Sequence, residues 1–398
     1  MTSVNVVFMG NLLYPEGLAE TKRFQHFIDG VMEGEGNSAH VLLLRQSHPG
    51  RDDRHLAGEY CGVQYRTIGQ DISATIGLPL ATLRYLFGGC RFLGQARRRG
   101  GRNVLFLYGE PNLESFAFVI WARILAYQVL VDIVEDSYLV STNAPLASRL
   151  KAWSAAWATR HMRWFADGIV VISSYLEQKL RSVAGDVPVQ LIPISVDLDR
   201  IPESSGGFHQ PVKMLYAGSF GEKDGVENLI AAFEHVADEH PESELIMTGR
   251  GSTERMASIL KRIRASPFAG RIRYLGYLSD DEYFKVIGEC DIPCVVRAPS
   301  EFADRGFPFK LGEYLATGRP VVTARVSDVE MYLTDRVNAM VVEPGSVQAI
   351  VAAIKYLLAD EVRALAIGRA GRVVAAEHFS ARQSGRQLLQ LIAGMERS

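Results

Sequence analysis

The alternation of short apolar runs with longer amphipathic stretches constrains this chain more than any other feature. Runs rich in Val, Ile and Leu are separated by segments whose apolar residues recur at helical spacing. Fully apolar short runs are typical of strands buried on both faces of a parallel sheet, so the alternation predicts an α/β fold. We assign strands to residues 4–8, 41–44, 104–107, 129–134, 168–172, 213–217, 244–248, 271–275, 292–296, 320–323 and 339–342.

The chain is too long for one hydrophobic core. It has 398 residues, and a domain usually takes about 150. Residues 202–211 are rich in Gly, Ser and Pro, which is typical of a linker, and the alternation restarts directly after them. We therefore expect one α/β domain over 1–197 and a second over 198–379.

The composition excludes several classes of protein. There are 43 Lys and Arg against 45 Asp and Glu, a net charge of −2, so no basic field favours nucleic acid as a partner. The longest apolar stretch, 116–131, is interrupted by polar residues and is too short to span a membrane. The N-terminus lacks the basic region of a signal peptide, and we expect a cytoplasmic location. The four cysteines lack zinc-ligand spacing and are expected to be buried thiols, at Cys61, Cys90, Cys290 and Cys294.

Two glycine turns follow strands of the second domain. The segment YAGSFGEKDG, residues 216–225, contains a lysine and precedes an amphipathic helix. Glycine lets a phosphate approach the backbone closely, and the helix N-terminus attracts the anion. The second turn is TGRG, residues 248–251. Neither matches a P-loop or a GxGxxG fingerprint, and such turns also serve simple strand-to-helix connections.

A more specific segment is GFPFKLGEYLATGRPVV, residues 306–322. It predicts a short helix over 310–317 that stops at a glycine and leads into a buried strand. Glu313 lies inside this otherwise apolar helix, where an unpaired carboxylate is costly. Either Glu313 is exposed or caps a neighbouring element, or it accepts hydrogen bonds from the hydroxyls of a ligand.

At this segment the chain resembles the retaining GT-B glycosyltransferases of family 4, the group 1 type. YAGSFGEKDGVENLIAAF, RIRYLGYLSDDEYFKVIGECDI and NAMVVEPGSVQAIVAAI resemble the same family, as do ADGIVVISSYLEQKL and VQLIPISVDLDRI. The resemblance is strongest over 211–380 and looser before 165. It implies two Rossmann-like domains facing a central cleft, with a nucleotide-sugar donor held by the second domain and the acceptor by the first. We also expect the C-terminal helix, about 380–398, to pack back on the first domain.

The resemblance also implies roles for particular residues. Glu313 would accept hydrogen bonds from the donor ribose, Tyr277 and Leu278 would lie near the base, and Lys223 would lie near the diphosphate. Glu135 and Asp136 occupy the place of a pair near the transferred sugar, and Gly17 would lie across the cleft. The remaining donor-binding positions are Gly218, Ser219, Gly249, Gly306, Phe307, Phe309 and Lys310.

Three positions depart from the family pattern. Ser219 stands where the family has an arginine, Arg305 where it has a glutamate, and Pro308 where it has a glycine. We expect Arg305, which we count with the catalytic residues, and Lys310 to restore positive charge near the diphosphate. No metal or cofactor is expected, and Asp280 and Asp281 are expected to cap a helix.

All four tryptophans lie between residues 121 and 164. Leu146, Leu150, Trp153, Trp157 and Trp164 follow helical spacing and are flanked by basic residues. Such a stripe favours packing on the sheet. An acid-free tract with six arginines, Arg84–Arg102, independently favours an anionic membrane. Together they predict a peripheral contact at the inner face of the membrane and a lipid-linked acceptor.

The sequence thus predicts a glycosyltransferase that moves a sugar from a nucleoside diphosphate donor to a glycan or lipid-linked acceptor, with retention, in polysaccharide or glycoconjugate assembly. Two alternatives stay open. A paralogue without catalysis would bind the nucleotide sugar and support a partner transferase. A GT-B epimerase would act on the nucleotide sugar without an acceptor.

Overall fold

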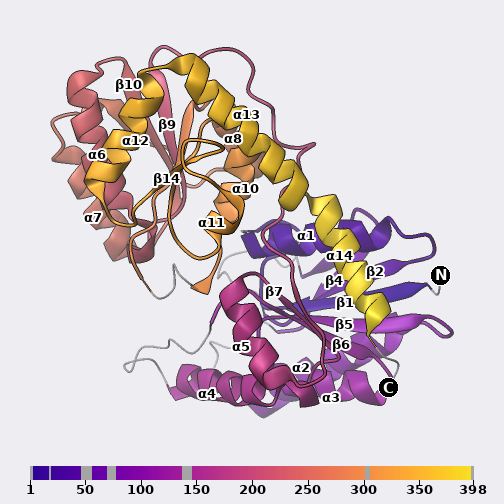
Figure 1. The fold of residues 1–398 in the computed structure, drawn as a ribbon. Coiled ribbons are helices and arrows are strands. Elements are labelled where there is room, and N and C mark those ends of the chain that lie inside the picture. Colours follow the sequence, from indigo (N-terminus) through magenta and orange to yellow (C-terminus); the bar gives the residue numbers. More distant parts are fainter. Residues whose placement is uncertain are drawn as a thin grey trace. The chain divides into compact units, whose positions relative to one another are not determined.

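The computed structural model describes residues 3–17, 19–45, 56–69, 78–136, 146–300 and 305–395. The chain divides into two compact units (Figure 1). The first comprises Met1–Pro193 and Ala381–Ser398, and the second comprises Ile194–Ser380. The sequence places these boundaries at 197/198 and 379/380. Residues 202–211, the linker-like segment within the expected second domain, lie inside the second unit, where the backbone N–H of His209 donates to Asp291.

The first unit is built on an eight-stranded sheet of order β3-β4-β2-β1-β5-β6-β7-β8. All neighbours are parallel except β3 and β4. The central strands are apolar and buried, as their sequence predicts. The strands are β1 (Val4–Gly10), β2 (Ser38–Leu43), β3 (Ala57–Tyr60), β4 (Val63–Thr67), β5 (Arg102–Tyr108), β6 (Gln128–Ile133), β7 (Gly168–Val171) and β8 (Val189–Leu191).

The antiparallel pair β3–β4 was not expected from the sequence. Both strands are short and polar, and β3 is exposed along its whole length. Cys61 and Gly62 form the turn with positive φ values of 49° and 77°, the backbone geometry that two-residue hairpins favour. Cys61 is exposed in this turn and Cys90 is half-buried, so the expectation of buried thiols is confirmed only for Cys290 and Cys294.

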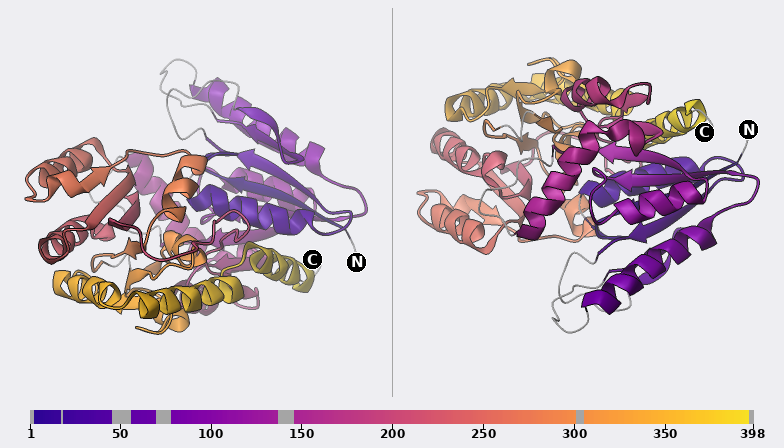
Figure 2. Two further views of the ribbon diagram at one scale, coloured as in Figure 1. Left: turned by 90° about the horizontal axis from the view of Figure 1, so that it is seen from above. Right: turned by 90° about the horizontal axis from the view of Figure 1, so that it is seen from below.

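Helices cover both faces of the first sheet. On one face α1 (Ala19–Met32) packs against the C-terminal helix α14 (Ala381–Gly394), where a side chain on Gly30 would lie 2.3 Å from the Cα of Gly385. Aromatic side chains of α1 and aliphatic ones of α14 join the strands in one core. The helices of the other face are α2 (Leu78–Ala96), α3 (Phe116–Ile124), α4 (Leu146–Arg160) and α5 (Ser174–Ala184) (Figures 1 and 2).

The second unit has a fully parallel six-stranded sheet of order β11-β10-β9-β12-β13-β14. The chain order therefore reverses between β9 and β12, and ligands of open α/β sheets bind outside the carboxyl ends of strands at such a switch point. The strands are β9 (Val212–Ser219), β10 (Ser243–Arg250), β11 (Ile272–Tyr274), β12 (Ile292–Val295), β13 (Val322–Ala324) and β14 (Met340–Val342).

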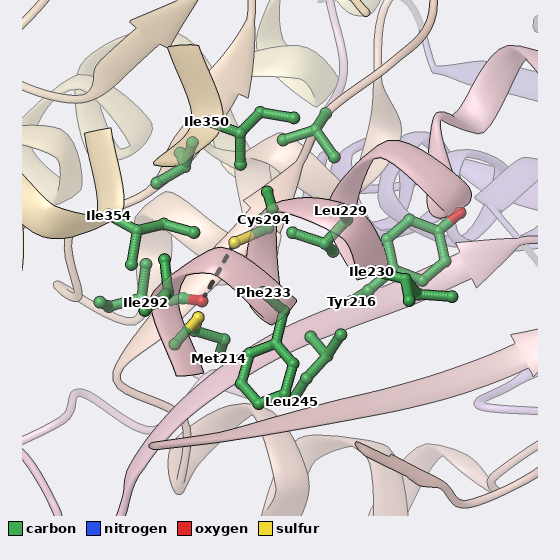
Figure 3. Packing of buried hydrophobic residues seen from close by; sticks show 14 of the residues in the cluster. Met214, Tyr216, Leu229, Ile230, Phe233, Leu245, Ile292, Cys294, Ile350 and Ile354 are labelled. Atoms are coloured by element: carbon green, nitrogen blue, oxygen red, sulfur yellow. Dashed lines mark hydrogen bonds between the residues drawn. The ribbon is translucent and has the colours of Figure 1, made fainter. Parts of the chain in front are cut away.

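A close-packed apolar core joins this sheet to its helices. Met214 and Tyr216 of β9 lie against Leu229 and Phe233 of one helix, and Ile354 approaches from another (Figure 3). The helices of the unit are α6 (Val226–Glu239), α7 (Thr253–Arg264), α8 (Asp280–Gly288), α10 (Phe309–Ala316), α11 (Val329–Tyr332), α12 (Val347–Leu358) and α13 (Glu361–His378). Asp280 and Asp281 occupy the first turn of α8, but the residue that caps it is Ser279.

Candidate functional site

The connection from β9 to α6 lies at the switch point of the second sheet. Gly225 ends it with φ = 66°, and a side chain there would lie 2.0 Å from the carbonyl oxygen of Val296, just beyond β12. Glycine is required at this position by both the backbone conformation and the contact. Backbone packing at Gly225 therefore brings the N-terminus of α6, with its partial positive charge, against the end of β12.

Asp224 organises the same turn. Its Oδ2 accepts hydrogen bonds from the Oγ of Ser219, at 2.7 Å, and from the backbone N–H of Gly221, at 2.8 Å. The carbonyl of Lys223 accepts the N–H of Ala298 at 3.0 Å, so the turn is bonded to the loop after β12 as well. The hydroxyl of Ser219 is directed into this turn.

The turn after β10 approaches β9 more closely than any side chain would allow. Gly249 pairs with Gly218 in register, and a Cβ on Gly249, whose φ is 129°, would lie 1.8 Å from the carbonyl oxygen of Gly218. The N–H of Gly249 donates to the carbonyl of Gly276 at 2.9 Å, and Thr248 Oγ1 donates to the same oxygen at 2.7 Å. The loops after β9, β10 and β11 thus form one bonded set.

Tyr277 presents an aromatic ring at the edge of this set. The ring is 53% exposed, and the guanidinium of Arg250 lies 4.8 Å from its centre. Leu278 beside it is half-buried. An exposed ring backed by a cation can stack against a flat base. Arg250 was missed from the sequence because nothing in the TGRG turn indicates that its arginine lies over a ring 27 residues later in the chain.

Tyr283 of α8 contacts two residues of α10, Lys310 and Glu313. The Tyr283 hydroxyl donates to Oε2 of Glu313 at 2.6 Å, and Lys310 Nζ donates to the same oxygen at 2.8 Å. The ammonium of Lys310 also lies 3.8 Å from the centre of the Tyr283 ring. Burial, and next the Glu313 carboxylate, raise the pKa of Tyr283 well above 10, so this hydroxyl stays a donor. The costly unpaired carboxylate is avoided because Glu313 is charge-paired and hydrogen-bonded.

Helix α10 is fixed to the second sheet by Tyr314, which is fully buried. The N–H of Ala217 in β9 donates to the Tyr314 hydroxyl oxygen at 2.7 Å. The residues that precede α10 are partly or fully buried: Arg305 and Gly306 are half-buried, and the Phe307 ring packs against Tyr332 and Phe379. Phe309 begins the helix after Pro308. The backbone near Phe307 is therefore held by its buried ring, which leaves the backbone as the group that can meet a ligand.

The remaining predicted residues belong to the first unit. Glu135 is exposed beyond the end of β6, whereas the next residue, Asp136, is 4% exposed. Asp136 accepts a hydrogen bond from Lys179 Nζ of α5 at 2.8 Å. Gly17 follows β1, and a side chain there would meet Thr21 of α1 at 2.0 Å. Lys179 was also missed from the sequence, because a lysine on an amphipathic helix gives no sign of the carboxylate it meets.

The structure thus brings most predicted donor residues to one edge of the second sheet, in two groups that are both bonded to β9. The two groups are the glycine turns, with Gly218, Ser219, Lys223, Gly249 and Tyr277, and α10, with Lys310 and Glu313.

No group of three or more metal-ligating side chains occurs among the residues that the structure describes. The same part of the chain contains no helix long and apolar enough to cross a membrane.

Residues 211–360 match the model of the family described as Glycosyl transferases group 1. This segment, which is less than half of the chain, is similar to that family. The match covers the glycine turns, Tyr283 and α10, so both groups of predicted donor residues lie within the matched segment.

The named relatives are only distantly similar to this chain in sequence. A phosphatidyl-myo-inositol mannosyltransferase of Mycolicibacterium smegmatis is 26% identical over 349 residues, which are 86% of this chain and 82% of that protein. A glycogen synthase of Mycobacterium tuberculosis is 23% identical over 250 residues, 60% of this chain and 58% of that protein. The alignment therefore spans little more than half the length of this glycogen synthase.

Solved structures show the fold of the whole chain. Sucrose-phosphate synthase from Thermosynechococcus elongatus superposes with a TM-score of 0.77 at 16% identity, covering 98% of both chains. HepE of Anabaena in complex with UDP-glucose superposes with a TM-score of 0.70 at 15% identity, covering 98% of this chain and 99% of that one. The chain therefore has the GT-B fold that its sequence resemblance predicts.

Proposed function

We propose that this protein is a glycosyltransferase that moves a sugar from a nucleoside diphosphate sugar to a glycan or lipid-linked acceptor. The observation that carries the proposal is the grouping of two lysines, a helix N-terminus and the half-buried carboxylate of Glu313 at the switch point of the second sheet. This is the chemistry that a nucleoside diphosphate needs, because its phosphates are anionic and its ribose carries hydroxyl donors. The group 1 domain supports it.

The geometry supports the donor roles that the sequence resemblance implies. Tyr277, backed by Arg250, offers a surface for the base, and Leu278 adds an apolar edge. Glu313 accepts hydrogen bonds from the ribose hydroxyls, held by the Tyr283 hydroxyl. An ammonium has three donors, so Lys310 can keep its bond to Glu313 and still reach a phosphate. Lys223, Arg305 and the N-terminus of α6 add positive charge.

In the reaction the bond between the sugar's anomeric carbon and the diphosphate oxygen breaks, and a bond to the acceptor oxygen forms. The acceptor hydroxyl loses its proton, and the nucleoside diphosphate leaves with an additional negative charge. Lys223, Arg305 and Lys310 stabilise that charge without a metal ion. Retention of configuration, assignment to family 4, acceptor binding by the first unit, and contact of Glu135 and Asp136 with the transferred sugar belong to this proposal. They rest on the sequence resemblance.

A thermal-shift panel of UDP, GDP, ADP, CMP and dTDP with their sugar conjugates tests the donor site. A nucleotide at 100 times its dissociation constant stabilises the native state by about 2.7 kcal/mol. UDP and GDP come first because HepE binds UDP-glucose and one relative, the GDP-mannose-dependent mannosyltransferase of M. smegmatis, is named for GDP-mannose. We expect one base to dominate, and Lys310→Ala to weaken its binding by about ten- to a hundredfold, the loss of a charge-assisted hydrogen bond.

The matched control is Lys261→Ala, which removes an exposed lysine of α7 and should leave the affinity unchanged. Equal affinity of the wild type and Lys310→Ala would contradict the donor site. Binding without transfer to any glycan or lipid acceptor would favour the paralogue without catalysis. Interconversion of the sugar nucleotide in the absence of an acceptor would favour the epimerase.

A further inference from the structure

Helix α4 and the short 3-10 helix after it, Met162–Trp164, expose their tryptophans. Trp153 of α4 and Trp164 are 66% and 55% exposed, and Leu146 and Leu150 of α4 are exposed as well. The expectation that the stripe of Leu and Trp side chains packs on the sheet is therefore wrong. The helix instead packs through the opposite side, which consists of small and polar residues, Ser154, Ala155, Ala158 and Thr159.

The exposed apolar surface continues from α4 onto α3. The ring centre of Phe116 lies 6.4 Å from that of Trp157 and 5.3 Å from that of Phe165. Phe116 starts a row at intervals of four residues along α3 that includes Ile120 and Ile124, both exposed. The aromatic contacts at Phe116 therefore join the stripe of α4 to the row on α3.

Helix α2 extends the surface further. The indole N–H of Trp121 in α3 donates to the carbonyl of Cys90 in α2 at 3.1 Å, which joins the two helices. Phe87, one turn before Cys90, is 67% exposed, and Leu83 is exposed a turn earlier. The three helices cover the same side of the first unit (Figures 1 and 2). The tryptophan face comprises the exposed residues Leu83, Phe87, Ile120, Trp121, Ile124, Leu146, Leu150, Trp153, Trp157 and Trp164.

The helices that carry the tryptophan face contain basic residues and no acidic ones. Residues 78–109, 115–131 and 146–166 contain no Asp or Glu. Five exposed arginines come from α2, α4 and the turn after it: Arg84, Arg91, Arg149, Arg160 and Arg163. Within the predicted arginine tract, Arg98 donates to the carbonyl of Gly36 and Arg102 donates to that of Ala393.

The carboxylates nearest this surface in sequence have cationic partners. Glu114 is paired with Arg45 and Lys151, each at 2.8 Å, and Asp167 is paired with Arg123 at 2.9 Å. These two acids therefore pair with Arg45, Arg123 and Lys151 and not with the five exposed arginines.

We propose that the tryptophan face docks the protein on an anionic lipid bilayer. Tryptophan and leucine side chains on an amphipathic helix enter the boundary between headgroups and acyl chains, while flanking arginines contact anionic headgroups. A second copy of this chain is a poorer occupant, because an isologous contact would place the arginines of one copy against those of the other. The contact lies on the surface of the bilayer and involves no spanning helix.

The docking surface is distinct from the donor site and needs no donor. That a lipid-linked acceptor is reached in this way rests on the proposed function. Lipid binding and nucleotide binding are separate measurements, so either idea can fail while the other stands.

Co-sedimentation of the full chain with vesicles tests the docking surface. Vesicles of phosphatidylcholine alone are compared with vesicles that also contain phosphatidylglycerol, and we expect binding to the second kind only. Arg160→Gln with Arg163→Gln should lower partitioning about thirtyfold, about fivefold for each cation. Trp153→Ser should lower it about tenfold through lost apolar contact.

Matched controls lie in the second unit. Val362→Ser removes an exposed apolar side chain of α13, and Arg264→Gln removes an exposed arginine of α7; neither should change partitioning. Binding that is equal on both kinds of vesicle, or unchanged in the arginine and tryptophan variants, would overturn the proposal. So would an oligomer in solution that Trp153→Ser dissociates, since the face would then be an interface between copies.

Discussion

Tyr283 illustrates how one buried side chain positions a proposed site residue, Glu313. Its hydroxyl donates to Glu313, and its ring lies under the ammonium of Lys310. The hydrogen bond fixes one oxygen of a carboxylate that the proposed ribose contact needs. The sequence predicted roles for Glu313 and Lys310 in donor binding but none for Tyr283, because a tyrosine in an amphipathic helix usually packs in a core.

The raised pKa of Tyr283 makes stability depend on pH at the alkaline end. The folded state holds the proton more tightly than the unfolded chain, whose tyrosines titrate near pH 10. This contribution is fully present below about pH 10 and is lost as the pH rises toward the folded-state value. We expect the unfolding free energy above pH 10 to fall less steeply in Tyr283→Phe, by about 1.4 kcal/mol per pH unit.

Urea unfolding at a series of alkaline pH values measures the two slopes. Phenolate absorbance, followed in parallel, should show one group fewer that ionises only on unfolding. Parallel slopes for the wild type and Tyr283→Phe would show that the Tyr283 hydroxyl ionises alike in both states.

At the scale of elements, the glycine turns depend on close approach between strands and loops. Gly225 touches the end of β12 and Gly249 touches β9, so two of the three loops are closed by contacts that exclude a side chain. A local pattern of strand, glycine turn and helix predicted these connections. It did not predict which neighbour each glycine meets, because that depends on strand order.

Gly225→Ala should therefore be destabilising. Alanine disfavours the positive φ of this position, and its methyl group would overlap the carbonyl of Val296. We expect a loss of at least about 2 kcal/mol in unfolding free energy, since a strained backbone conformation alone costs about 1 kcal/mol or more. Denaturant unfolding measures it. Gly270→Ala is the control, because nothing lies within 4 Å of a Cβ there; equal stability of the two variants would contradict the argument.

At the scale of the whole molecule, each unit has its own core and its own buried links. In the first unit Arg23 of α1 donates two hydrogen bonds of 2.8 Å to Asp132 of β6 and others to the carbonyls of Ile192 and Pro193. Both charged side chains are fully buried. The pair thus joins a helix, a central strand and the segment with which the chain leaves the unit.

Arg23→Leu should destabilise the first unit selectively. It leaves Asp132 charged and without its partner, a change that costs about 3–5 kcal/mol for buried pairs. We expect faster amide hydrogen exchange across β1, β5 and β6 and unchanged protection in β9 and β10, measured peptide by peptide. The double variant Arg23→Leu with Asp132→Leu should recover part of the loss. Equal loss of protection in both sheets would contradict the expectation that only the first unit is destabilised.

The sequence by itself determined the α/β class, nearly all of the buried strands, the glycine turns and the helix that carries Lys310 and Glu313. These features are local: they depend on apolar periodicity, on glycine and on residues a few positions apart. The exposed hairpin β3–β4 was missed because its strands are short and polar. Only the tertiary structure placed Tyr283 on Glu313, Lys179 on Asp136 and Arg250 over Tyr277, because these contacts join residues 27 to 43 positions apart. It also decided that the tryptophans point outward, since periodicity shows that a helix has an apolar side but not whether anything covers it.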